Sequence, residues 1–213
     1  DILETSPNAE AQRQLALTYN DMGISTYLEG KFEDAVAWFD AAMRESPEDP
    51  FFYINKGDSY RAAGQFETAL ANYHHAQDLG AEGEIITQRV ALAHYSIAGK
   101  FIQMREYEQG LFELNKAIET HGNFPAFFIT RAKILVASEQ YEQALEDLLK
   151  AQELDPTNEE VKQMLGSEVN PKPQQRTRKV KPKAKPKRPT KAETIMHSIE
   201  DLRSRPFDYL NGT

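Results

Sequence analysis

The chain has 213 residues, of which 40% are hydrophobic, and its formal net charge is -8 at pH 7. It has no cysteine, which excludes disulfides and cysteine-ligated metal sites and favours a cytoplasmic setting over secretion. No charged and then apolar leader opens the sequence and no apolar run reaches about 18 residues, so we expect a soluble protein that makes no membrane contact.

Residues 16–49 form a unit whose small and aromatic residues return at a spacing of 34. Gly23 permits close approach of two helices, Gly30 permits a turn with positive φ, and alanines fit between crossing helices. Each unit is therefore predicted to be a helical hairpin. The matched pairs are Gly23 with Gly57, Gly30 with Gly64, Phe32 with Phe66, Ala35 with Ala69, Phe39 with Tyr73, and Ala42 with Ala76.

This order of glycines, aromatic residues and alanines, followed by Pro47, resembles the tetratricopeptide repeat. The resemblance implies an all-α fold, a superhelical solenoid of four such hairpins over residues 1–170. It also implies protein–protein interaction as the class of function.

The first two hairpins have clear start and stop signals. Ser6 can cap a helix that begins at Pro7, and we expect the first hairpin to join helices 7–28 and 32–44. The second repeat, residues 50–83, should join helices 51–62 and 66–79.

The third repeat, residues 91–124, follows the second at a spacing of 41, seven residues more than the spacing of 34. Seven residues are about two helical turns, so the insertion 84–90 predicts a longer first helix whose face is not rotated. In this repeat Ala98 and Arg105 occupy the places of the two glycines, and Gly110 occupies that of the first alanine.

The fourth repeat, residues 125–158, keeps the 34-residue spacing and ends at Asp155-Pro156. A helix over 157–169 is predicted to cap the stack, because Val161, Met164 and Leu165 fall on one face.

Residues 171–191 form a basic linker with 10 Lys or Arg and no Asp or Glu, whereas residues 1–170 hold 13 basic and 29 acidic residues. Its five prolines predict an extended strap that could bind an acidic surface, such as a microtubule, a nucleic acid or an acidic protein. A solvated tether and a nuclear-import signal remain alternatives. The candidate residues are Arg178, Lys179, Lys181, Lys183, Lys185, Lys187 and Arg188.

Residues 192–213 are predicted to form a short amphipathic helix and an aromatic tail. This helix is too short to be stable alone, so we expect its apolar face to dock on a surface, preferably that of a neighbouring molecule. The candidate docking residues are Ile195, Met196, Ile199, Leu202, Phe207, Tyr209 and Leu210.

No catalytic or metal constellation stands out, and we expect no enzyme activity, no catalytic residue, no metal and no cofactor. The five histidines show no metal-ligand spacing, and the carboxylates are spread along solvated helix faces. Neither a phosphate loop nor a nucleophile elbow is present.

The resemblance implies that the first helices of the hairpins line a concave groove for a protein partner. Some chaperone-binding members of the family clamp a terminal carboxylate with Lys, Asn and Arg. Here only Asn55 matches, since Asn20, Leu92 and Ser96 occupy the places of the cations, so this mode is rejected. The implied groove residues are Asn20, Ile24, Tyr27, Phe51, Ile54, Asn55, Asp58, Arg61, Leu92, Tyr95, Ile102, Ile129 and Lys133.

The sequence therefore favours a non-enzymatic adaptor that holds one partner in its groove, reaches an acidic surface with its tail and belongs to a larger complex. The alternative is a structural subunit of a large cytoskeletal or ciliary assembly associated with microtubules. A nucleic-acid-associated adaptor ranks below both. We expect a cytoplasmic protein, with cytoskeletal, ciliary and nuclear settings left open.

Overall fold

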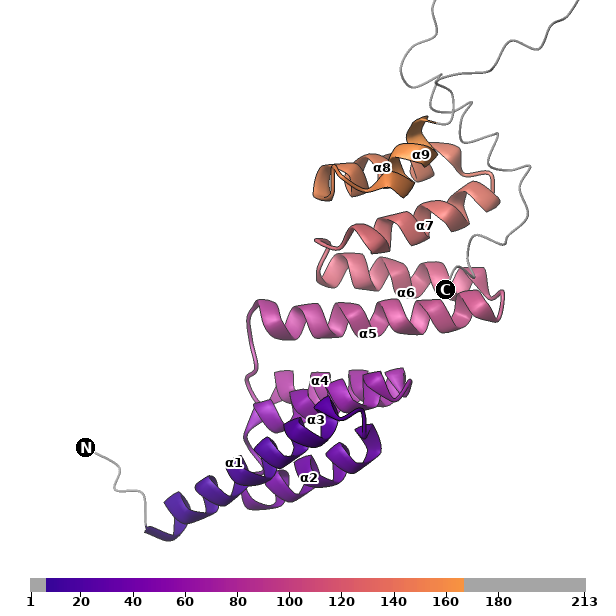
Figure 1. Cartoon of the computed structure of the whole chain (residues 1–213). Coiled ribbons are helices and arrows are strands. Elements are labelled where there is room, and N and C mark those ends of the chain that lie inside the picture. The colour runs from indigo at the N-terminus through magenta and orange to yellow at the C-terminus, as the bar shows by residue number, and fades with distance from the viewer. Residues whose placement is uncertain (1–6, 167–213) are drawn as a thin grey trace, which may run out of the picture. The chain divides into compact units, whose positions relative to one another are not determined.

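A computed structural model describes residues 7–166 of the chain, and every regular element in this range is an α-helix (Figure 1). These helices fall into two compact units, divided after Gly122. The first contains α1 to α6 and the second α7 to α9. The bounds are α1 Pro7–Leu28, α2 Phe32–Glu45, α3 Pro50–Ala62, α4 Phe66–Asp78, α5 Glu84–Gln103, α6 Tyr107–Thr120, α7 Pro125–Ala137, α8 Tyr141–Leu154 and α9 Glu159–Gly166.

Consecutive helices in the first unit pair as the hairpins α1/α2, α3/α4 and α5/α6. The turns inside the first two hairpins depend on glycine, because Gly30 has φ +78° and Gly64 has φ +77°. The predicted turn positions are therefore confirmed. In the third hairpin Arg105 adopts φ 62°, the left-handed conformation that the missing glycine would have taken at less cost.

Close approach of the two helices in a hairpin also explains the other glycine of each repeat. A Cβ atom built on Gly23 would lie 2.5 Å from Cε1 of Phe39, and one on Gly57 would lie 2.5 Å from Cε1 of Tyr73. The ring occupies the volume that a side chain would need. The predicted role of these glycines in helix packing is thus confirmed.

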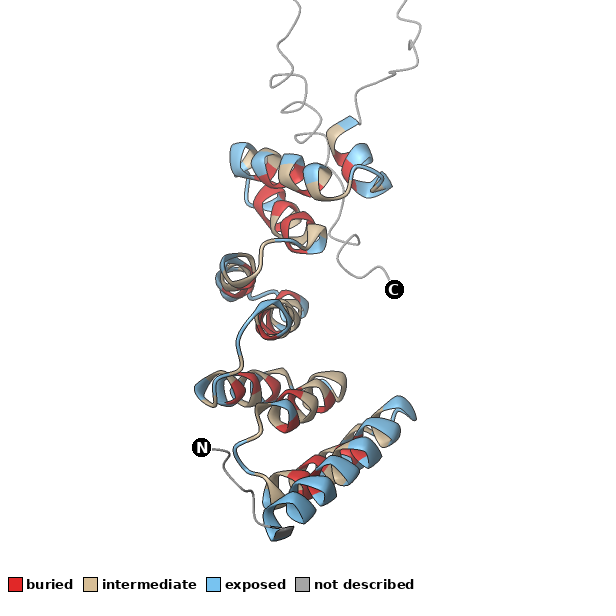
Figure 2. Cartoon of the chain, turned by 90° about the vertical axis from the view of Figure 1, so that its left-hand side faces the viewer, coloured by how far each residue is buried: buried red, intermediate tan, exposed pale blue. Residues whose placement is uncertain are grey.

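The core lies between the helices, and Figure 2 shows the buried positions along the faces where they meet. The alanines that the repeat pattern assigned to this interior are fully buried, as are the aromatic residue Tyr73 and the leucines at its place in later repeats. The fully buried alanines are Ala35, Ala42, Ala69, Ala76, Ala117, Ala144 and Ala151.

The helix α5 spans 20 residues and includes the insertion, so the lengthened first helix of the third repeat is confirmed. Its added turns carry Ile86 and Val90 into the core that Ile54, Tyr73 and Ala76 form in the preceding hairpin. The insertion therefore extends the packing surface between α5 and the second hairpin.

Local signals at the N-terminus of α3 set where this helix begins. The carboxylate of Asp49 accepts a hydrogen bond of 3.0 Å from the Phe51 amide, and Pro50 takes the first helical position, one residue before the predicted start. The second helices of the hairpins each carry an acidic residue in the first turn, where its negative charge interacts favourably with the helix dipole. These residues are Glu33 and Asp34, Glu67, Glu108 and Glu142.

The second unit holds the fourth hairpin, α7 and α8, and the short helix α9. Arg131 of α7 binds the buried carboxylate of Asp147 of α8 through two hydrogen bonds, of 2.8 and 2.7 Å. The helix α9 buries Val161 and Met164, and its N-cap Asn158 accepts a bond of 3.1 Å from the Val161 amide. It begins two residues later than the predicted capping helix.

The basic linker 171–191 and the terminal stretch 192–213 lie outside the described residues. The docking helix and aromatic tail predicted there remain predictions. Within residues 7–166, no helix is long and apolar enough to cross a membrane.

Candidate partner-binding surface

The first helices of the three hairpins in the first unit, α1, α3 and α5, are joined by direct side-chain contacts. The Asn55 side-chain amide donates a hydrogen bond of 2.7 Å to the Asn20 side-chain carbonyl, which connects α3 to α1. The Arg89 guanidinium binds the Asp58 carboxylate at 2.8 Å, which connects α5 to α3. We use the name first-helix surface for the exposed and half-buried side chains of α1, α3 and α5 around these contacts. They are Asn20, Ile24, Tyr27, Phe51, Asn55, Arg61, Leu92 and Tyr95.

Asp58 is the centre of this network. Its second carboxylate oxygen accepts a hydrogen bond of 2.7 Å from the hydroxyl of Tyr73, whose ring is fully buried. Burial of the hydroxyl, together with the neighbouring Asp58 charge, raises the pKa of Tyr73 far above its ordinary range. Tyr73 is therefore neutral and a permanent donor, and Asp58 is held in place on two sides.

Apolar side chains on the same helices remain accessible. The Phe51 side chain is 65% exposed, and Ile24 is 38% exposed. The Tyr27 ring packs against Phe32, with a centroid distance of 5.3 Å, and is half-buried. Arg61, Leu92 and Tyr95 are also half-buried. The first-helix surface therefore combines exposed apolar groups with fixed polar groups.

Three of the implied groove residues are much less accessible than a groove requires. Ile54 belongs to the core between the second hairpin and α5, and Ile102 lies against Gly110 of α6, with Cγ1 3.0 Å from the position that a Cβ on Gly110 would take. In the second unit Ile129 is buried, while Lys133 pairs with Glu160 of α9 at 2.7 Å. These isoleucines stabilise packing and leave little surface for a partner.

Two accessible residues and one cation were missed by the sequence argument. Leu17 lies 34 positions before Phe51 and is 38% exposed, so the repeat spacing could have identified it. Leu28, next to Tyr27, is 77% exposed. Arg89 lies in the insertion, which has no counterpart in the other repeats, so no periodic signal could have indicated its pairing with Asp58.

Within residues 7–166, several histidines and carboxylates take part in packing contacts and ion pairs. His94 and Glu113 are buried together and join α5 to α6 through a contact of 2.6 Å between Nδ1 and Oε2. Among residues 7–166, no cluster of three or more histidine or acidic side chains could hold a metal ion.

Comparison with known proteins identifies the fourth hairpin as a known type of repeat. A family model described as "Tetratricopeptide repeat" matches residues 126–158. The human "Tetratricopeptide repeat protein 16" is 27% identical over 124 residues, which are 58% of this chain and 14% of that protein. The mouse "Protein O-mannosyl-transferase TMTC3" is 28% identical over 151 residues, 67% of this chain and 16% of that protein. The chain thus matches only a small part of these curated relatives.

Solved structures share the fold at low sequence identity. MamA, residues 41 to the end, from Desulfovibrio magneticus RS-1 has a TM-score of 0.52 and 18% identity, covering 71% of this chain and 82% of that one. YrrB, described as a tetratricopeptide repeat protein "with an unusual peptide-binding site", has a TM-score of 0.50 and 16% identity, covering 74% and 79%. Together with the family match over residues 126–158, the 34-residue spacing and the glycine-dependent hairpins, these structures show that the chain contains tetratricopeptide repeats and has their fold.

Proposed function

We propose that the chain is a non-enzymatic adaptor that binds a segment of a partner protein on its first-helix surface. Tetratricopeptide repeat proteins generally mediate protein–protein interactions, and a solved neighbour of this fold is described as having a peptide-binding site. The observation that carries the proposal here is the exposed Phe51 ring, which lies on α3 about one helical turn before Asn55, the residue bonded to Asn20.

Apolar side chains of the partner would supply most of the affinity. Leu17, Ile24, Leu28 and Phe51 are exposed on consecutive first helices, and aromatic residues are enriched at the buried centres of protein interfaces. Burying such side chains contributes about 25 cal/mol per Å² of apolar surface removed from water, which must offset the entropy lost on association.

Polar groups on the surface would align the partner's backbone. Each asparagine amide can both donate and accept, and their mutual hydrogen bond leaves further capacity for an extended peptide. The Asp58 carboxylate already binds two donors, so it is better suited to hold Arg89 in position than to bind a partner. We therefore assign Asn20 and Asn55 to backbone recognition and Asp58 to support.

Photo-crosslinking can test this assignment with a matched control. Phe51 of α3 is 65% exposed and Phe112 of α6 is 59% exposed, but Phe112 lies on a second helix. A photoreactive phenylalanine analogue at position 51 should crosslink a discrete protein, and the same analogue at position 112 should not. Equal crosslinking of the same protein from both positions would contradict the assignment.

We further propose that the basic linker binds an acidic surface. The support is the sequence alone, in which an acid-free run of Lys, Arg and Pro follows an acidic body. Replacing five of its ten cations with glutamine should weaken binding to microtubules or nucleic acid and flatten its salt dependence, while the melting temperature stays unchanged. Equal binding by the parent and the variant would show that the linker only connects the repeats to the terminal segment and does not itself bind an acidic surface. The replaced residues are Lys181, Lys183, Lys185, Lys187 and Arg188.

A further inference from the structure

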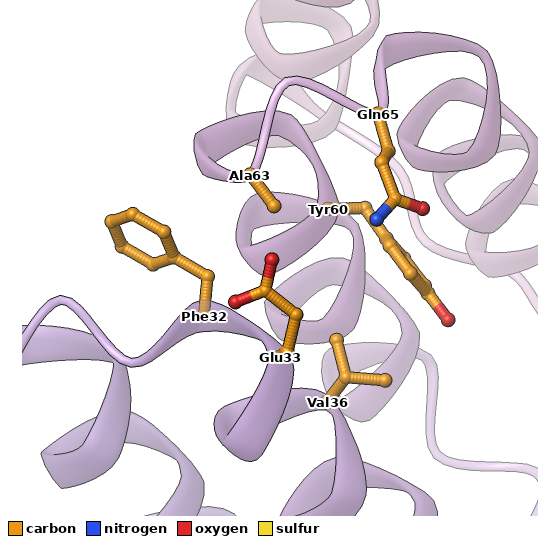
Figure 3. Close-up of a pocket in the computed structure, with 6 residues that line it drawn as sticks. All are labelled: Phe32, Glu33, Val36, Tyr60, Ala63 and Gln65. Carbon is orange, nitrogen blue, oxygen red and sulfur yellow. The ribbon is translucent and has the colours of Figure 1, made fainter.

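A small pocket lies where the first two hairpins meet, at the end of the hairpins that carries their internal turns (Figure 3). Its volume is about 170 Å³, and a cavity of roughly 150 Å³ can hold a benzene-sized group, so it has room for one side chain. The first turns of α2 and the last turn of α3 form its walls. Its lining consists of Phe32, Glu33, Val36, Tyr60, Ala63 and Gln65.

Contacts outside the pocket fix its two aromatic walls. The Phe32 ring packs on Tyr27 at a centroid distance of 5.3 Å. The Tyr60 ring lies 5.8 Å from the Lys56 ammonium, which is itself bound to Asp40 at 2.6 Å. Both rings are therefore preorganised, and a side chain that enters the pocket need not order them first.

The Glu33 carboxylate is the charged group of the pocket, and Figure 3 shows it pointing toward Ala63. Within residues 7–166, no basic side chain pairs with Glu33. The neighbouring cation Lys31 is bound to Glu29 at 2.8 Å, and Asp34 adds a second negative charge to the same helical turn. The local charge favours a cation.

The next junction along the chain shows how such a carboxylate is satisfied. Glu67 lies one repeat after Glu33, in the first turn of α4, and the Lys100 ammonium of α5 binds it at 2.5 Å. At the junction of the first two hairpins, the position equivalent to Lys100 is Ser59. Its side chain is fully buried and donates to the Asn55 carbonyl at 3.1 Å, so it cannot take this role.

We propose that this pocket binds a lysine side chain of a partner protein. The four methylene groups of the lysine would lie against the apolar lining of the pocket, which Phe32, Val36, Tyr60 and Ala63 supply. The ammonium would bind Glu33, as the Lys100 ammonium binds Glu67 at the next junction. The inference rests on the proposed adaptor function. It adds to the first-helix surface a second contact region, which would select partners that carry a suitably placed lysine.

NMR titration of the full chain tests the pocket with a defined probe. Methyl signals of Val36 and Ala63 should shift on addition of N-acetyl-lysine methylamide and shift much less with the norleucine counterpart, which has the same four side-chain carbons but ends in a methyl group without the ammonium. Glu33→Gln should raise the concentration needed for half of the shift by about two- to fivefold, the range of a partly exposed ion pair. Equal shifts with both probes, or an unchanged titration of Glu33→Gln, would overturn the proposal.

Two control variants separate the possible occupants. Glu67→Gln removes an equivalent carboxylate that is already paired, so it should leave the Val36 and Ala63 titration unchanged. Replacing the same five linker cations, from Lys181 to Arg188, with glutamine should also leave it unchanged. A response that appears only after this replacement would show that the chain's own lysines occupy the pocket, which would overturn a partner lysine as the occupant. Because these readouts do not involve Phe51, failure here leaves the crosslinking test of the first-helix surface intact.

Discussion

Replacing Gly57 with alanine should destabilise the first unit, although alanine is the better helix former. The new Cβ would lie 2.5 Å from Cε1 and 2.8 Å from Cδ1 of Tyr73. The Tyr73 ring is fully buried, and its hydroxyl is bound to Asp58 at 2.7 Å, so it cannot move aside at low cost. The contact between α3 and α4 must therefore open.

The magnitude follows from two opposing effects. Overpacking of a core costs about 1–3 kcal/mol, and the gain in helix propensity from glycine to alanine returns about 0.5–1 kcal/mol. We expect a net loss of about 1–2 kcal/mol in the free energy of unfolding. With a urea dependence of about 2 kcal/mol per molar, the unfolding midpoint should fall by roughly 0.5–1 M.

Gly99 provides the matched control, because it lies inside α5 and a Cβ there would meet nothing within 4 Å. Gly99→Ala should therefore keep only the propensity gain and raise the midpoint. Fluorescence of Trp38, the one tryptophan of the chain, reports on the first hairpin during urea unfolding. If Gly57→Ala kept or raised the midpoint, the explanation of the repeat glycines by close packing would be wrong.

Ala69→Glu should lower the melting temperature by an amount equivalent to several kcal/mol, because it forces volume and a charge into a fully buried position, and an unchanged melt would contradict that placement. Asp58→Ala should cost about 1–3 kcal/mol in urea unfolding, since it leaves a buried tyrosine hydroxyl without its acceptor, whereas Arg89→Gln should cost less than about 1 kcal/mol; equal costs would refute this ranking. The hydrogen bond from Lys100 lowers the pKa of Glu67, so the pair stabilises the fold above the unfolded pKa and ceases to do so as pH falls through the folded pKa. Lys100→Gln should therefore lower the midpoint slightly at pH 7 but not at pH 2, and an equal loss at both would contradict the ion-pair explanation.

The repeat pattern predicted most of the fold because each signal acts locally. A glycine with positive φ ends a helix wherever it occurs, and a glycine facing an aromatic residue of the next helix needs only the two residues and their spacing. The seven-residue insertion predicted a longer α5 for the same reason, since two helical turns preserve the packing face.

Contacts between different repeats could not be predicted in this way. The pairing of Asp58 with Arg89 joins a repeat position to the insertion, and the pocket arises where Glu33 of one hairpin meets Ala63 of the next. The burial of Ile54 depends on Ile86 and Val90, which the insertion supplies. Each of these features requires the three-dimensional arrangement of neighbouring helices.

The central claim, that the first-helix surface binds a partner protein, is tested most directly by the affinity of the crosslinked partner for two matched variants. Isothermal titration calorimetry with the purified partner should show that Phe51→Ala weakens binding at least about tenfold, as expected for a buried aromatic contact. Phe112→Ala removes a similarly exposed ring from α6 and should change the affinity less than about twofold. Equal affinity of the parent and Phe51→Ala, or a larger loss with Phe112→Ala, would contradict the claim.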